Sequence, residues 1–300
     1  MIRFLLALFL LTSSALAQTD TLRVKVDSLF IRASSGLLKY RALEEPSKKA
    51  LREMPTAIPY LVEKLAIQDA RERRELINIL GKMPDAIMPV CSAALSPNKD
   101  IVKTACEILS AIRDTIKDGH AATPYLLKAR MHPELQARGY AVFALGKWGG
   151  GGAKEALQEA LADSVNFVRV EAAAGLGYLK VTATLPNLIQ AFADDYYGVR
   201  FAAANSLIKF NNISLPYLYK ALESENPMVR QLAAETLGKM RAPEAVAPLS
   251  RLLKSQLWTD RLAAMEALAE IDTPTARQLL SSHSEEEPLL KTRLEELTKK

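Results

Sequence analysis

The pattern that decides the fold is VRVEAAAGLG at residues 168–177, because related decamers recur along most of this 300-residue chain. Aligning the copies on Arg169 gives seven anchor positions, separated by 29, 36, 31, 31, 30 and 31 residues. These anchors are Arg73, Val102, Arg138, Arg169, Arg200, Arg230 and Arg261. A period of this length is typical of repeat proteins in which each copy is one supersecondary unit.

Apolar residues keep fixed distances from each anchor. The seventh position is always leucine, as at Leu176, and the third is alanine or leucine, as at Ala172. Because the fourth and tenth positions are also apolar, the spacing is that of one helical face. Glu171 lies between these positions and is expected at the surface. The eighth position is often glycine, which costs about 1 kcal/mol relative to alanine in a helix, so it predicts close approach of a neighbouring helix.

A second, shorter apolar segment precedes each anchor. Proline opens it in all but one copy, and proline is compatible with the first turn of a helix but not with its interior. Each repeat is therefore predicted to be a pair of antiparallel helices, and the chain an all-α solenoid with helical caps. We expect a cap helix region over 18–45 and a solenoid over 46–300, comprising about seven full repeats, a half-repeat and a C-terminal cap.

The segment LIQAFADDYYGVRFAAA at residues 188–204, with its counterparts around Arg169 and Arg230, resembles HEAT repeats of the short type also found in phycobilisome lyases. The resemblance covers roughly residues 46–298 and implies an armadillo-like α-solenoid. In that family an aspartate six residues before the arginine pairs with it in a ladder between repeats. Asp163 and Asp194 occupy this place, whereas other copies carry His132, Ser224, Ser255 or Ile67.

The first 17 residues are typical of a secretory signal peptide. Arg3 precedes an apolar run, and Ala15-Leu16-Ala17 forms an A-x-A cleavage site. The run is shorter than the roughly 20 residues that a membrane-spanning helix needs. We therefore expect cleavage after Ala17, export to the periplasm or the exterior, and no membrane span in the mature chain.

Sequence motifs for chemistry are not found. The chain contains no catalytic or metal-binding motif, and its histidines, His120, His132 and His283, fall in predicted loops or near the end. No metal or cofactor is expected. An enzyme related to bilin lyases is an alternative that rests only on the repeat type. Nucleic-acid binding is less favoured, because the net charge of +5 is mild and no long basic block occurs.

Cys91 and Cys106 fall in facing core positions of one predicted helix pair. In an exported protein they could form a disulfide, and the alternative is two free buried thiols. The sequence leaves this choice open.

Aromatic residues lie off the core positions in the middle copies, at Tyr140, Phe143, Tyr178 and Phe201. In the resembling family these anchor-bearing helices line the concave face of the solenoid. Exposed aromatics clustered on one face are typical of binding sites, although they could instead pack between repeats. We therefore expect a non-enzymatic exported scaffold that binds a protein or peptide partner there. The pattern does not indicate an oligomeric state.

Overall fold

The computed structural model describes residues 20–112 and 119–299, which form helices joined by turns and loops, with no β-strand among them. This confirms the predicted all-α class. The predicted signal peptide lies outside the described residues. Within the described ranges, none of the helices combines the length and the apolar character that crossing a membrane requires.

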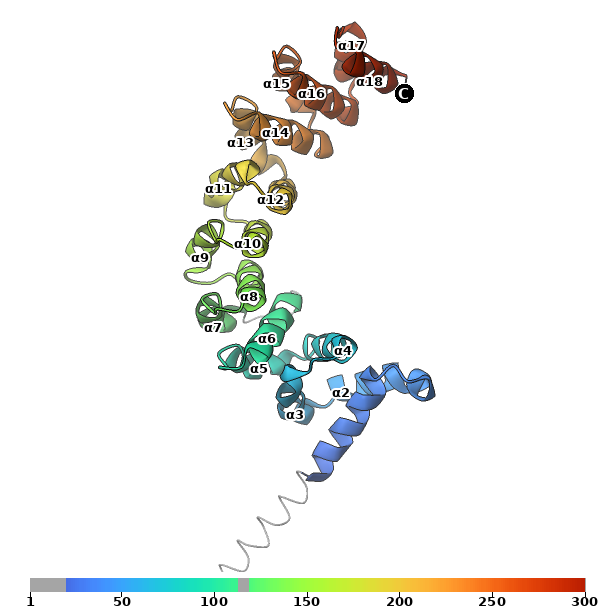
Figure 1. Ribbon diagram of the computed structural model, residues 1–300, viewed down its shortest axis with the longest axis vertical. Helices are drawn as coiled ribbons and strands as arrows, with labels where there is room; N and C mark the ends of the chain where they lie inside the picture. The colour runs from blue at the N-terminus through green and yellow to red at the C-terminus, as the bar shows by residue number, and fades with distance from the viewer. Residues whose placement is uncertain (1–19, 113–118, 300) are drawn as a thin grey trace, which may run out of the picture. The chain divides into compact units, whose positions relative to one another are not determined.

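Antiparallel helix pairs follow one another along the chain (Figure 1). We call the first member of each pair the leading helix and the second the anchor helix. The leading helices are α3 (Ile58–Val62), α5 (Ile87–Ala93), α7 (Thr123–Ala129), α9 (Ala153–Ala160), α11 (Leu185–Gln190), α13 (Leu215–Ala221) and α15 (Val246–Leu252). The anchor helices are α4 (Ala70–Leu80), α6 (Lys99–Ala111), α8 (Leu135–Trp148), α10 (Asn166–Leu179), α12 (Tyr197–Lys209), α14 (Pro227–Lys239) and α16 (Trp258–Ile271).

Short 3-10 turns lead into or extend several leading helices, and one follows the N-terminal helix. They are η1 (Leu38–Leu43), η2 (Pro55–Ala57), η3 (Glu63–Ala66), η4 (Pro84–Ala86), η5 (Gly119–Ala122), η6 (Thr182–Thr184), η7 (Ala191–Ala193), η8 (Asn211–Ser214) and η9 (Pro243–Ala245). The prolines that were expected at helix starts do lie in the first turns; Pro186, for example, is the second residue of α11. A missing N–H is harmless there.

The chain forms two compact units, one ending at Ala144 and the other beginning at Leu145, so that the boundary falls within α8. In the first unit, a helix over 20–34 buries Val26, Phe30 and Ala33. It is followed by α2 (Glu44–Arg52), which packs against α4 and buries Leu51 completely. These two helices close the core of the first unit.

The second unit ends in one more helix pair, α17 (Pro274–Ser282) and α18 (Pro288–Thr298). Both helices pack against α16. On α18, Leu290 and Leu294 are buried, while Leu297 is only half-buried. The end expected to be a simple cap is therefore a complete pair, which covers the last apolar face of the repeats.

The core positions are those that the periodicity predicts. The third residue after each anchor is fully buried in every copy: Leu76, Ala105, Ala141, Ala172, Ala203, Ala233 and Ala264. So is each leucine at the seventh position: Leu80, Leu109, Leu145, Leu176, Leu207, Leu237 and Leu268. The register of the repeat is thereby confirmed.

Glycines at the eighth position allow anchor helices to touch. A Cβ added to Gly146 would overlap the backbone of Gly175, and one on Gly238 would lie 2.8 Å from the Cα of Ala267. Gly177 fits in the same way against Ser206. The prediction is wrong at Gly81, which ends α4 and meets only the carbonyl of its own helix.

We predict that Gly146→Ala destabilises the protein by about 1–3 kcal/mol, because the backbone of α10 must move to admit the methyl group. This is opposite in sign to the gain of about 1 kcal/mol that helix propensity alone would give. Urea unfolding measures the difference. Gly151→Ala is the control, since nothing lies within 4 Å of its added Cβ. Equal stability of the two variants would contradict the close approach.

Candidate interaction surface

The anchor helices of the second unit bury one face and expose the other. On the exposed side of α10 and α12, Tyr178 and Phe201 are 47% and 46% accessible. Each lies on the opposite side of its helix from a fully buried leucine, which is Leu176 in α10 and Leu207 in α12. Large apolar groups on the exposed face of a repeat therefore need an explanation other than the core.

An aromatic cluster lies at the start of α12. The rings of Tyr197 and Phe201 stack, with centroids 6.0 Å apart and planes at 26°. The guanidinium of Arg200 lies 5.6 Å from the Tyr197 centroid. Tyr197 is 62% exposed, so this stack presents a ring to solvent.

Lysines from the next repeat cover two of these rings. The Nζ of Lys209 lies 3.7 Å from the centroid of Tyr178, and that of Lys239 lies 5.8 Å from the centroid of Phe201. Burial and the neighbouring charge of Lys180 both lower the pKa of Lys209. We call Tyr178, Tyr197, Phe201 and Lys209 the aromatic–lysine surface. It combines flat apolar area with positive charge that partner carboxylates could neutralise.

A hollow of about 230 Å³ lies farther along the same face, between α14 and α16. Its wall includes Trp258, which is 50% exposed, and the carboxylates of Glu235, Glu266 and Glu270. Lys239 pairs with Glu235 at 2.6 Å. Arg293 pairs with Glu266 at 3.1 Å. Lysines therefore lie over the aromatic–lysine surface, whereas the hollow is lined by three carboxylates, two of which are paired with a cation.

Pairs of arginine and carboxylate tie successive repeats together. Arg169 donates to Asp194 from Nε and Nη2 at 2.7 and 2.9 Å, while its Nη1 donates to the carbonyl of Asp163. Arg230 pairs with Asp260 and Arg261 with Glu285. The carboxylate of Asp194 comes from the position that the family resemblance implies. Asp260 and Glu285 come from other positions, which sequence spacing did not reveal.

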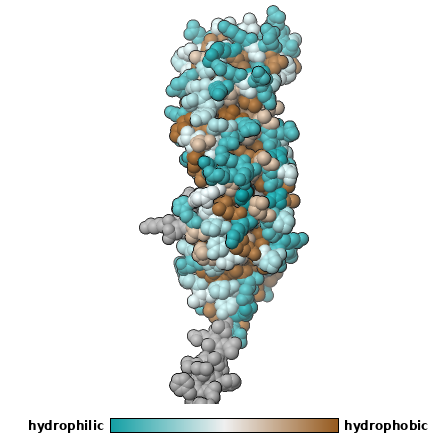
Figure 2. Space-filling model, turned by 90° about the vertical axis from the view of Figure 1, so that its left-hand side faces the viewer, coloured by the Kyte–Doolittle hydropathy of each residue, from teal (hydrophilic) through white to brown (hydrophobic). Residues whose placement is uncertain are grey.

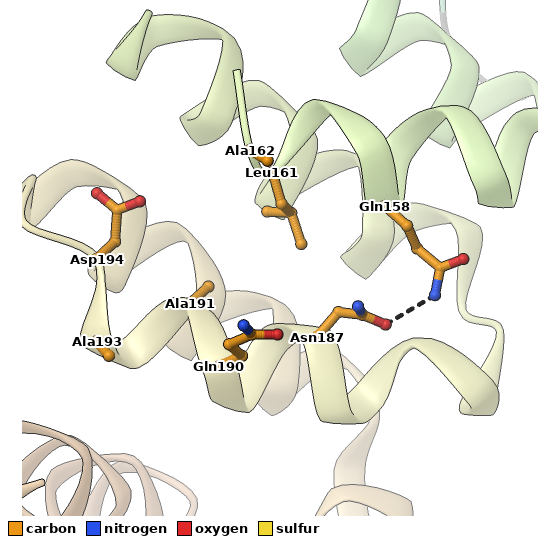
Figure 3. A pocket seen from close by; sticks show the side chains of 8 residues that line it. All are labelled: Gln158, Leu161, Ala162, Asn187, Gln190, Ala191, Ala193 and Asp194. Carbon is orange, nitrogen blue, oxygen red and sulfur yellow. Dashed lines mark hydrogen bonds between the residues drawn. The ribbon is translucent and has the colours of Figure 1, made fainter. Parts of the chain in front are cut away.

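The hollow in Figure 3 lies between α9 and α11, on the side of the leading helices. Gln158 donates to the side-chain oxygen of Asn187 across it at 2.8 Å. A similar hollow between α13 and α15 is lined by the equivalent repeat positions, with Tyr219 in place of Gln158. Because it recurs with the repeat, we attribute it to the stacking of helix pairs. Hydrophobic and hydrophilic residues are interspersed on this side of the molecule (Figure 2).

The predicted site residues fall in both units. Tyr178 and Phe201 lie on adjacent helices of the second unit, whereas Tyr140 and Phe143 lie on the part of α8 before Ala144 and are half-buried. A single site formed by all four stays a prediction. Periodicity did not single out Tyr197 and Trp258, which occupy the first turns of α12 and α16. Both residues lie at a helix start, three residues before the anchor, and this shared position was the sequence signal that could have identified them.

Cys91 and Cys106 lie on α5 and α6, which pack against each other. Both thiols are buried and unbonded, and burial raises the pKa of each to about 12. The disulfide stays a prediction. Within residues 20–112 and 119–299, no group of three or more histidine, cysteine or acidic residues is placed to hold a metal ion.

The stacked pairs, the buried leucine column and the arginine–carboxylate pairs define an α-solenoid of helical repeats. The family model for HEAT repeats matches residues 123–208 and 215–297. The chain therefore belongs to the HEAT-repeat family. Comparison with curated protein sequences gave no match.

Solved structures resemble this chain to different degrees. YibA of Escherichia coli is 18% identical with a TM-score of 0.51, and the match covers 86% of this chain and 97% of that one. Human deoxyhypusine hydroxylase is 17% identical with a TM-score of 0.36, covering 85% of this chain and 99% of that one. An engineered protein is 16% identical with a TM-score of 0.38, covering 90% and 87%. At 18% identity, the likeness to YibA concerns the fold alone.

Glu171, which was expected to be an ordinary surface residue, is half-buried on α10, and burial raises its pKa to about 7. The folded protein therefore holds this proton more tightly than the unfolded chain. The associated stability is fully present below pH ~4.5 and is lost as the pH rises to about 7.

We predict that Glu171→Gln stabilises the protein at pH 8, by at most about 3 kcal/mol, because the buried charge is removed. At pH 4.5 the variant and the parent should be equally stable. Urea unfolding at both values measures this, with Glu225→Gln as the exposed control. A stability difference that does not change with pH would contradict the raised pKa.

Proposed function

We propose that this protein is an exported, non-enzymatic HEAT-repeat scaffold that binds a protein or peptide through the exposed face of its anchor helices. The aromatic–lysine surface is the observation that carries the proposal. Its rings stand on helices whose opposite face is fully buried, so folding alone does not account for them. Aromatic residues and flanking charges are the groups that dominate binding energy at protein interfaces.

The charged residues on this face indicate which chemical groups a partner should carry. Lys209 and Lys180 favour carboxylates beside the aromatic cluster, whereas Glu270 with the indole of Trp258 favours a basic side chain between α14 and α16. A segment with an apolar side chain between an acidic and a basic group would fit both halves. Nucleic acid fits less well, because Glu235 and Glu266 interrupt the lysines along the face.

We predict that Phe201→Ala weakens binding by about tenfold or more, since truncating a buried interface aromatic loses more than about 1–2 kcal/mol. The mature protein is used to capture partners from the exported fraction of its native cells. Each identified partner is then titrated by calorimetry against the parent and the variant. Ile213→Ala is the control, because Ile213 is 55% exposed but lies in η8, off this face.

The unfolding midpoint of Phe201→Ala should match that of the parent. If the variant folds normally and binds every partner with unchanged affinity, this surface is not the binding site. If the variant unfolds, Phe201 packs between repeats, and the aromatic–lysine surface is not a binding site. If the parent protein instead binds nucleic acid with an affinity that falls steeply with salt, and Phe201→Ala leaves protein binding unchanged, the partner is a nucleic acid.

Export is supported by the character of residues 1–17. We predict that protein recovered from the exported fraction begins at Gln18, because cleavage follows an A-x-A site. Intact mass measurement decides where the mature chain begins. A gain of two hydrogens on reduction would in addition report a Cys91–Cys106 bond. Full-length protein confined to the cell interior would contradict export.

A further inference from the structure

Two contacts hold successive anchor helices of the second unit together. The first is a small residue at the eighth position that fits against the sixth position of the next anchor helix, as Gly177 does against Ser206. The second is a carboxylate from the next repeat that binds the anchor arginine, as Asp194 binds Arg169. Both contacts join α10 to α12. Both also join α14 to α16, through Gly238 with Ala267 and through Arg230 with Asp260.

Neither contact is made between α12 and α14. The position equivalent to Asp194 is Ser224, whose hydroxyl accepts from the backbone N–H of Asn226. Asp194 accepts the equivalent backbone N–H of Tyr196 and still binds Arg169, because a carboxylate has two oxygens and a hydroxyl has one. Arg200 donates from Nη1 to two backbone carbonyls of its own repeat. Its buried Nε has no hydrogen-bond acceptor among the residues that the structure describes.

The small-residue contact is lost at the same place. Ile208 occupies the eighth position of α12, and Thr236 the facing sixth position of α14, so two β-branched side chains stand where glycine meets a small residue elsewhere. Helices α12 and α14 are in much less contact than α10 with α12 or α14 with α16. Figure 1 shows α10 and α12 nearly end-on and α14 and α16 from the side, so the helix direction changes here.

We propose that the junction between α12 and α14 is a hinge. It joins a first block, residues 153–209, to a second block, residues 215–271, each held internally by both contacts. A buried donor without an acceptor costs about 1–3 kcal/mol, and opening the junction lets water reach the Arg200 Nε. Opening is therefore less costly at this junction than at the α10–α12 and α14–α16 junctions on either side of it. Local motion in a folded protein usually begins where such contacts are fewest.

The hinge controls the exposed face. Lys239, on α14, lies over the ring of Phe201, on α12, and this contact crosses the junction. Opening separates the aromatic–lysine surface from the hollow that Trp258 lines. The spacing of the two halves is thus variable, while the chemistry of each half is constant. This inference concerns motion within the repeats and does not depend on a partner.

Spin labels at one repeat position test the hinge. The exposed residues Glu159, Gln190, Lys220 and Arg251 each precede an anchor by ten residues. Distance distributions are measured by pulsed electron paramagnetic resonance for the Q190C/K220C pair, which spans the hinge. The E159C/Q190C and K220C/R251C pairs span the two flanking junctions. Labelling of the parent protein controls for reaction at the two buried thiols.

We predict a clearly broader distribution for Q190C/K220C than for either flanking pair. Ser224→Asp supplies the missing carboxylate, so it should narrow that distribution and slow amide exchange in α12 by about 5–30-fold. Ser224→Asn has the same shape without charge and should do neither. Equal widths for the three pairs in the parent protein overturn the hinge, whatever the variants do. An unchanged width in folded Ser224→Asp overturns the missing ion pair as its cause.

Discussion

In the repeats of Arg169, Arg230 and Arg261, the anchor arginine links contacts within one repeat to a contact with the next repeat. Its Nη1 donates to carbonyls in the loop of its own helix pair, as Arg230 does to Ser224 and Glu225. Its Nε edge meanwhile binds a carboxylate of the next repeat. One guanidinium thus fixes both the turn within a repeat and the distance to its neighbour, because its donors form a rigid planar fork. In this pair Asp260 is fully buried and the Arg230 side chain is 15% exposed, so loss of either partner would leave the other poorly solvated.

The core positions keep one register in every repeat, including the repeat whose anchor is Val102. The third and seventh positions of the anchor helix face the core, and the eighth faces the next helix at Gly146, Gly177 and Gly238. Only a small residue fits there when the backbones touch. The opposite side of the anchor helix makes neither of these two contacts and is partly exposed. Tyr178 and Phe201 stand on that side.

Variation among the pairs shows how the same contact can be built differently. Asp194 supplies its carboxylate from the loop, whereas Asp260 does so from the first turn of α16, with Ser255 donating to it at 2.7 Å. The two solutions place the carboxylate near the same guanidinium edge. At the position of Asp194 the next repeat has Ser224, and among the described residues no other carboxylate binds the Nε of Arg200. Of the three junctions within residues 153–271, two therefore have both contacts and the one between α12 and α14 has neither.

The sequence by itself determined the class, the helix pairs and the core, because a period near 31 and apolar spacing at three, four, seven and ten depend only on local helical geometry. It also pointed to Tyr178 and Phe201. Only the tertiary structure showed the burial of Glu171, the substitution of Asp260 for a missing loop aspartate, the ring-covering lysines and the unpaired Nε of Arg200. Each of these depends on a residue about 30 positions away or on burial by neighbours. Helical periodicity carries no information about such contacts, because they are set by the distance between stacked helices.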